Sequence, residues 1–190
     1  MRRSRVAPLV ATAVALAGAS CATVDPVEPI CARPADSILV LQAQSVPSAT
    51  RLPCIAELPI GWQFGGSLVR DDGSTLWLDH DRAGMHAVEV ELMATCDVSS
   101  AVEVPPAPDE VGMSTYQEPH SLEPFVGTRS LVFDGGCIVY RYRFASDSEP
   151  ALVIEADSAL STVPRADVVA EVRETLDLTV CGAGAPPCEG

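Results

Sequence analysis

The chain has 190 residues, and its 26 acidic side chains outnumber its 12 lysine and arginine side chains, which gives a formal net charge of −14 at pH 7. So acidic a protein offers no overall electrostatic attraction to nucleic acid or to an anionic lipid surface. The chain contains no lysine, which excludes a Ser-x-x-Lys acyl-transfer site and a Walker-type phosphate loop, because both need a lysine ammonium group.

The first twenty residues have the features of an export signal. Arg2, Arg3 and Arg5 form a positive head, and residues 6–17 form an apolar segment. That segment is too short to cross about 30 Å of hydrocarbon as a helix. We therefore expect residues 1–20 to be a signal peptide and not a permanent membrane helix.

The end of this segment, Leu16-Ala17-Gly18-Ala19-Ser20-Cys21, resembles the cleavage and acylation box of bacterial lipoproteins. Ala19 and Ser20 fit that pattern, whereas Gly18 stands where these proteins usually have leucine. The resemblance implies that the mature protein begins at Cys21, carries lipid on its sulfur and has the membrane as a partner. The expected location is the outer face of the cytoplasmic membrane or the cell envelope; the alternative is secretion after ordinary signal-peptidase cleavage.

The cysteine count favours lipidation. The chain has seven cysteines, an odd number that leaves one thiol unpaired in an oxidising compartment. Diverting Cys21 to a thioether leaves six, enough for three disulfide bonds. Nearest-neighbour pairing, which we favour, gives Cys31–Cys54, Cys96–Cys137 and Cys181–Cys188, whereas matching the near-equal spacings gives Cys54–Cys96, Cys137–Cys181 and Cys31–Cys188.

The rest of the chain divides into a tether, one domain and a tail. Residues 21–30 contain two prolines and two acids, and predict a lipid-anchored tether. Fully extended at about 3.3 Å per residue, it holds the domain within about 30 Å of the membrane surface. Residues 31–182 have the usual size of a single domain with one core. We expect the tail, residues 183–190, to be flexible.

Apolar patterning predicts four strands. The β-like run at residues 36–46 ends at Pro47, and residues 87–95 alternate as a half-buried strand. Residues 151–156 form an apolar run typical of a buried strand, and alternation returns at residues 177–181.

Two glycine-containing turns predict β-hairpins. Residues 67–70 and 75–78 flank Asp71-Asp72-Gly73-Ser74, where we expect the turn to need a positive φ. Residues 129–133 and 138–144 flank Asp134-Gly135-Gly136. With Gly135-Gly136 as the turn residues, Phe133 lies opposite Ile138 and Leu131 opposite Tyr140.

One helix is predicted at residues 164–176. Pro164 suits a first helical turn, and Val168, Val172 and Leu176 follow at helical spacing. The predicted fold class is therefore α+β: a mainly antiparallel sheet built from two hairpins plus flanking strands, with one amphipathic C-terminal helix and disulfide staples.

Residues 104–124 form a long proline-rich loop with neither helical nor strand periodicity. Loops of this length without secondary structure of their own are uncommon in compact domains and are often functional. We favour a surface connection between two half-sheets. The alternative is a recognition loop for a partner, with Met113, Tyr116 and His120 as the candidate contact residues.

Arg129, Arg141 and Arg143 are the arginine cluster of the predicted mature chain. Arg141 and Arg143 share a strand face and form a candidate clamp for a carboxylate or phosphate. On so acidic a chain we favour the alternative, in which these arginines pair with the protein's own aspartates and glutamates.

Asp79, His80, Asp81 and His86 are the densest group of candidate metal ligands, for calcium through the aspartates or for zinc through the histidines. Neither spacing matches a calcium loop or a His-Glu-x-x-His helix. Strand alternation also separates His80 from Asp79 and Asp81. We therefore predict no metal and no cofactor, and interpret the cluster as a solvated hairpin end.

Signs of catalysis are weak. A Gly-x-Ser-x-Gly motif is absent, and no carboxylate pair is singled out by an apolar setting. The aromatic residues are candidates for a sugar-stacking surface, although aromatics in alternating strands are usually core. They are Trp62, Phe64, Trp77, Tyr140 and Tyr142.

The predicted function is a non-catalytic interaction or assembly module of the cell envelope, with another envelope protein as partner and no nucleic acid. The alternative is a lipoprotein that binds a small solute or a glycan, and a distant third is an extracytoplasmic hydrolase. A cavity with convergent polar groups favours solute binding, whereas a solid core with an exposed apolar patch favours the interaction module.

Overall fold

The structure is a computed structural model that describes residues 27–122, 124–145 and 151–182. The predicted signal peptide, Cys21, residues 21–26 of the predicted tether and the predicted tail lie outside these residues. In chain order the elements are η1, a 3-10 helix (Pro34–Asp36), α1 (Leu39–Ser45), β1 (Arg51–Ile55), β2 (Trp62–Arg70), β3 (Gly73–His80), β4 (Gly84–Met93), β5 (Val102–Val104), β6 (Ser114–Gln117), β7 (Ser121–Leu122), β8 (Phe125–Phe133), β9 (Gly136–Arg143), α2 (Ala151–Ala159), β10 (Leu160–Pro164) and α3 (Arg165–Leu176).

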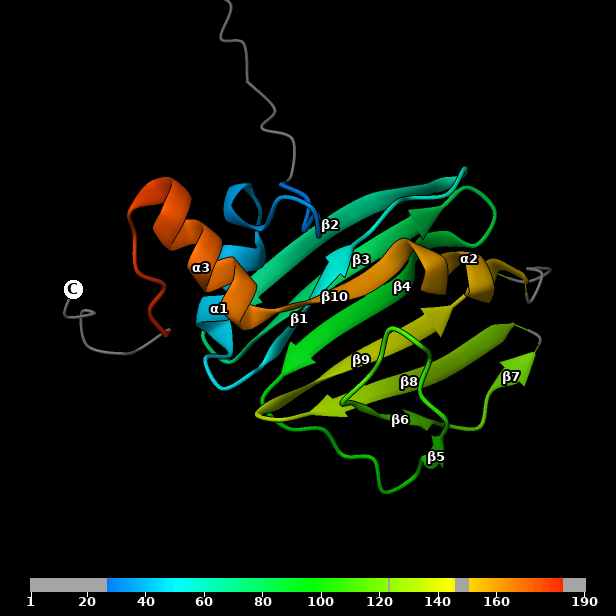
Figure 1. The fold of residues 1–190 in the computed structure, drawn as a ribbon. Helices are drawn as coiled ribbons and strands as arrows, with labels where there is room; N and C mark the ends of the chain where they lie inside the picture. The colour runs from blue at the N-terminus through cyan, green and yellow to red at the C-terminus, as the bar shows by residue number, and fades with distance from the viewer. Residues whose placement is uncertain (1–26, 123, 146–150, 183–190) are drawn as a thin grey trace, which may run out of the picture.

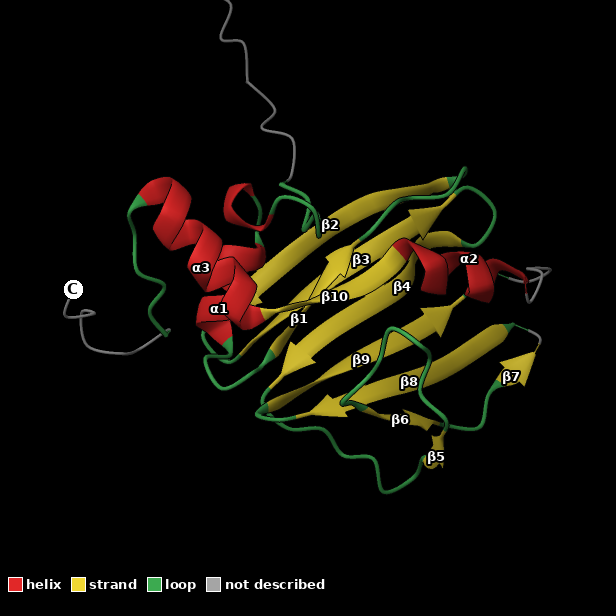
Figure 2. Cartoon of the chain, viewed as in Figure 1, coloured by secondary structure: helices red, strands yellow, loops and turns green. Residues whose placement is uncertain are grey.

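The fold is the α+β class predicted from the sequence. An antiparallel sheet has the strand order β2-β3-β4-β9-β8-β6-β5, with the short β7 paired to β8. β1 and β10 form a separate two-stranded ribbon. The ribbon and the helices lie over one face of the sheet, which we call the inner face (Figures 1 and 2). Both predicted hairpins are present, as β2-β3 and β8-β9.

The first hairpin turns one residue earlier than its glycine suggests. Arg70 pairs with Gly73, so Asp71 and Asp72 are the turn residues, and Gly73 has no positive φ. The prediction that the turn needs a positive φ at Gly73 is therefore wrong. A Cβ at Gly73 would lie 2.8 Å from the carbonyl oxygen of Leu92, so the close approach of β4 requires the missing side chain.

The second hairpin turns at Asp134-Gly135, since Phe133 pairs with Gly136 and Leu131 with Ile138. The predicted register is thus wrong by two residues. Because side chains alternate with a period of two, this shift leaves every side chain on its predicted face. Gly135 supplies the positive φ of the turn, at 75°.

Two predicted strands are helices. Residues 36–46 contain α1, which buries Leu39, Gln42 and Ala43, and residues 151–156 begin α2, which buries Leu152 and Ala156. These buried residues recur every three or four positions, which is the helical period. An apolar run this short does not distinguish the two structures by its composition. Residues 177–181 form no strand.

The predicted C-terminal helix is confirmed as α3, which buries Val168 and Val172. None of the helices described is both long and apolar enough to span a bilayer. The core lies between the inner face and the elements above it. Its sheet side includes Leu76, Leu78, Val88, Val90, Leu92, Leu131, Ile138, Tyr140 and Tyr142, and its upper layer includes Leu39, Ala43, Leu52, Leu152, Ala156, Val168 and Val172.

Two disulfides follow nearest-neighbour pairing. Cys31 pairs with Cys54 and Cys96 with Cys137, with Cα atoms 5.1 and 6.1 Å apart. The alternative pairing by equal spacing is therefore wrong. The third predicted pair involves Cys188, which lies outside the described residues.

The proline-rich residues 104–124 are not a structureless loop. They contain β6 and β7, both of which pair with β8. Between β5 and β6 the chain arches over β8 and β9 on the side that carries α2 and β10 (Figure 1). This arch, residues 105–113, positions the candidate site.

Candidate functional site

A partly open cavity of about 380 Å³ lies over the inner face, where the arch meets α2 and β10. We call it the Arg129 cavity. Ligand pockets typically enclose about 300–1,000 Å³, so this one has room for a small solute. It is lined by Ala56, Ala107, Asp109, Glu110, Met113, Arg129, Leu131, Tyr140, Asp157, Ser158, Leu160, Ser161 and Thr162.

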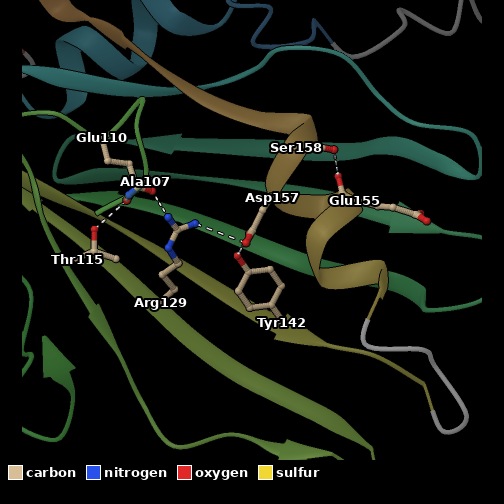
Figure 3. A network of polar contacts seen from close by, with 8 residues as sticks. All are labelled: Ala107, Glu110, Thr115, Arg129, Tyr142, Glu155, Asp157 and Ser158. Atoms are coloured by element: carbon tan, nitrogen blue, oxygen red, sulfur yellow. Dashed lines mark hydrogen bonds and ion pairs between the residues drawn. The ribbon is translucent and has the colours of Figure 1, made fainter. Parts of the chain in front are cut away.

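Strand register places Arg129 in the cavity. It pairs with Tyr140 across β8 and β9, and both residues lie on the inner face. The Arg129 side chain is only 20% exposed, and its Cζ lies 5.9 Å from the Tyr140 ring centroid. Figure 3 shows the guanidinium between Glu110 of the arch and Asp157 of α2.

Glu110 fixes the arch to the sheet. Its side chain is buried, and Oε1 accepts a hydrogen bond from Arg129 Nη2. Oε2 accepts hydrogen bonds from the Ala107 amide at 2.8 Å and from Thr115 Oγ1 at 2.9 Å (Figure 3). One carboxylate thus joins the arch, β6 and β8, and charge-assisted bonds of this kind are stronger than neutral ones.

Asp157 forms the opposite wall. Its Oδ2 lies 3.6 Å from Arg129 Nη1, and its Oδ1 accepts a hydrogen bond from the Tyr142 hydroxyl. Burial raises the pKa of Asp157, and the hydrogen bond from Tyr142 and the charge of Arg129 lower it. The charge of Asp109 raises the pKa further, so that the net shift is upward. Burial also raises the pKa of Tyr142, so Tyr142 remains a hydrogen-bond donor at neutral pH.

Asp157→Asn is expected to gain stability relative to the wild type as the pH rises from about 4. Because the pKa of Asp157 is raised in the folded state, the folded protein holds this proton more tightly than the unfolded chain. The contribution of Asp157 to the free energy of unfolding of the wild type therefore falls through the interval between the two pKa values. Asparagine does not titrate, so urea unfolding of both proteins at stepped pH measures the difference.

Asp97→Asn is a control of opposite sign. Hydrogen bonds from the side chain and backbone of Ser99 lower the pKa of Asp97. The wild type then gains stability relative to this variant as the pH rises through the folded pKa toward the unfolded one. The same sign for both variants, or a pH-independent difference for Asp157→Asn, would contradict the assignment.

Tyr140 contributes an unpaired hydroxyl. The residue is only 4% exposed and lines the cavity, yet its hydroxyl makes no hydrogen bond with any other residue that the structure describes. Burial raises the pKa of Tyr140, so the hydroxyl stays protonated. The hydroxyl oxygen is not among the fully enclosed polar atoms that lack a partner, so it opens to the cavity, where water or a ligand can reach it.

The arginine cluster is split between two faces. Arg141 lies on the outer face and pairs with Glu89, at 3.1 Å, and with Glu91, while Arg129 lies on the inner face. Arg143 is exposed on the strand that carries Arg141. Arg129 and Arg141 therefore pair with the protein's own acids, as the favoured alternative predicts, whereas no ion pair of Arg143 is present among the described residues.

The candidate partner-loop residues do not share one surface. Met113 is buried and lines the cavity. Tyr116 is half-buried on the outer face, opposite Ser130, and His120 is exposed, with its ring centroid 5.7 Å from that of Phe125.

The candidate metal ligands do not converge either. His80 is buried, and its Nδ1 accepts hydrogen bonds from the amides of Arg82 and Ala83, each at 3.1 Å. Asp81 Oδ1 lies 3.3 Å from His80 Nδ1, so the expected separation of these two residues by strand alternation is wrong. Asp79 accepts a hydrogen bond from the His86 amide at 2.6 Å. Within the described ranges, no three His, Cys, Asp or Glu side chains are grouped as a metal site requires.

The aromatic residues lie apart. Trp62, Tyr140 and Tyr142 are core residues, and Trp77 stacks on His86 with the ring centroids 5.1 Å apart. Of the five aromatics considered above, Tyr140 lines the Arg129 cavity.

Sequence reasoning identified Arg129 but missed its two acidic partners. Glu110 lies in a segment without periodicity, and Asp157 follows a run predicted as a strand. One signal for Asp157 was available in the sequence: it comes directly after the apolar run 151–156, as an acid at the edge of a buried helix face would.

In comparisons with known proteins, no family model, no curated protein and no solved structure matches the chain.

Proposed function

We propose that this protein is an exported, membrane-anchored binding protein that holds a small polar solute in the Arg129 cavity. The observation that carries the proposal is the convergence of Glu110, Arg129, Asp157 and the unpaired Tyr140 hydroxyl on one cavity, whose remaining lining is in part apolar. Sites for small molecules typically combine an apolar lining with a few polar groups that fix the ligand's orientation.

The arch supports solute binding over the interaction module. Met113 packs into the core, and Glu110 and Thr115 are buried and hydrogen-bonded to each other. These buried side chains form a cavity wall and are not offered to a partner, as the contact residues of a recognition loop have to be. The solute-binding alternative is therefore preferred to the assembly function expected first.

Binding is also preferred to hydrolysis. Ser158 and Ser161 line the cavity, but none of its described lining residues is a histidine that could activate a serine. Ser158 donates its hydroxyl hydrogen to the carbonyl oxygen of Glu155 at 2.7 Å (Figure 3). The two carboxylates are held by Arg129, which suits positioning of a ligand.

Anchoring through Cys21 is part of the proposal. Two disulfides in the folded domain are typical of oxidising, extracytoplasmic compartments. The lipoprotein-like segment then explains why the chain has a seventh cysteine. A Cys21→Ala protein that is still acylated and still in the membrane fraction would exclude this anchor.

A screen of small amines, amino acids, sugars and organic acids against the purified domain tests the binding function. At least one solute should raise the melting temperature of the wild type and of Arg141→Met, and should fail to do so for Arg129→Met. Arg141 is the matched control because it pairs with two glutamates on the outer face.

Arg129→Met leaves two carboxylates uncompensated and could weaken folding by itself. Ser158→Trp avoids that difficulty, because an exposed residue on the cavity lining gains bulk while all charges remain. It should fold normally and lose the solute. A bound solute that Ser158→Trp and Arg129→Met both retain at wild-type affinity would place binding elsewhere, and a screen with no hit would count against the function.

A further inference from the structure

The ionised groups of the Arg129 cavity carry an excess of negative charge. Three carboxylates, those of Asp109, Glu110 and Asp157, line it together with one guanidinium. Two negative charges are therefore left over. The whole chain has the same sign, with a net charge of −14, so its long-range field draws cations toward the cavity and repels anions.

Arg129 is not free to bind an anionic solute. Its Nη2 is hydrogen-bonded to Glu110, and its Nη1 lies 3.6 Å from Asp157. An anion that approached the guanidinium would lie beside both carboxylates and would be repelled by their charges. The guanidinium therefore organises the carboxylates and does not act as the anchor for a ligand.

Asp109 is the carboxylate without a local partner. It is exposed on the arch, and it makes no hydrogen bond or ion pair with another residue in the described ranges. Burial is the main cause of the raised pKa of Asp157 and of Tyr140, and the charge of Asp109 adds to both shifts. A cation between Asp109 and Asp157 would relieve the repulsion between these two acids.

The unpaired Tyr140 hydroxyl points to a ligand independently of the acids. Its oxygen can accept one N–H hydrogen bond in the cavity. The Tyr140 ring lies beneath Arg129, so it is not available as a stacking surface for a sugar. Without an open aromatic face the cavity does not favour a glycan, and the carboxylates around Tyr140 select a cationic N–H group among the possible hydrogen-bond donors.

Building on the proposed solute-binding function, we infer that the solute is a small organic cation with a primary ammonium or guanidinium group. The carboxylates of Asp109 and Asp157 hold the cationic group, and the Tyr140 hydroxyl accepts one of its hydrogen bonds. Glu110 and Arg129 fix the walls around it.

A matched set of four-carbon probes tests the charge preference. Isothermal titration at pH 7.5 and low salt compares 1,4-diaminobutane, 1,4-butanediol and succinate, which differ in charge and little in size. The diamine should bind at least about tenfold more tightly than the diol, succinate should not bind, and added salt should weaken the diamine because ionic interactions are screened.

Two single-charge variants locate the bound cation. Asp109→Asn should weaken diamine binding about three- to fivefold, the range expected for one partly solvated ion pair. Asp72→Asn removes the same charge from the exposed turn of the first hairpin and should change the affinity by less than about twofold. Equal effects of the two substitutions would show that overall charge, and not this site, attracts the diamine.

The outcomes separate this inference from the function on which it rests. Diol or succinate binding as tight as that of the diamine, lost in Ser158→Trp, would overturn the cation preference and leave the solute site standing. No binding by any of the three probes would also overturn the cation preference, whereas the function itself is decided by the wider screen.

Discussion

Replacing Glu110 with alanine is expected to lower the free energy of unfolding by about 3 kcal/mol. The substitution removes the acceptor of three hydrogen bonds, from Arg129, the Ala107 amide and Thr115. Arg129 then keeps Asp157, at 3.6 Å, as its ion-pair partner. Because the arch loses its connection to β6 and β8, solute binding should be lost together with stability.

Urea unfolding measures the loss, and Glu118→Ala is its matched control. Glu118 is a glutamate of the same proline-rich segment and accepts one side-chain hydrogen bond, from Ser100 at 2.9 Å, in an exposed setting. Its removal should cost no more than about 0.5 kcal/mol. Similar losses for the two variants would mean that the arch does not depend on the Glu110 carboxylate.

Gly135→Ala is expected to destabilise the protein by about 3 kcal/mol or more, because strain and a steric clash act together. Gly135 has a φ of 75°, and a Cβ there would lie 1.8 Å from the carbonyl oxygen of Ser48. The turn would have to move away from the chain between α1 and β1. That movement would also break the bonds from Ser48 Oγ to the Gly135 carbonyl and from Thr50 Oγ1 to the Asp134 carbonyl, at 2.6 and 2.8 Å.

Gly112→Ala isolates the backbone strain from the clash. Gly112 has a φ of 83°, but nothing lies within 4 Å of the position of its Cβ. Alanine should therefore cost only about 1 kcal/mol there, the usual penalty of a left-handed conformation. Thermal unfolding of both variants compares the two costs, and equal costs would rule out a tight fit between Gly135 and Ser48.

Local patterns in the sequence predicted the strands of both hairpins and α3, because each has several independent signals. β8 and β9 have alternation and a glycine turn, and α3 has Pro164 at its start and twelve residues of helical spacing. α1 and α2 have only seven and nine residues. Over so short a length an apolar run fits either period, and packing against the sheet decides the outcome.

The site was less predictable because it is assembled from distant segments. Arg129 meets Glu110 from the arch and Asp157 from α2 (Figure 3). Arg129 and Arg141 were predicted as members of one cluster, whereas the register of β8 and β9 puts them on opposite faces of the sheet. No local pattern reports which carboxylates lie above the sheet, since that depends on how the arch and α2 cross it.

The Cys31–Cys54 disulfide has a mechanical consequence for an anchored protein. Pro29 and Cys31 hydrogen-bond to Ile55 of β1, and the disulfide lies beside them. Tension on the tether would therefore enter the domain at Cys31 and pass through a covalent bond directly into β1. Residues 32–53, which include α1, lie within the closed loop and would bear no load. With the anchor as proposed, pulling on the membrane attachment would leave α1 packed on the core, and the load would pass to β1 and its partner strand β10.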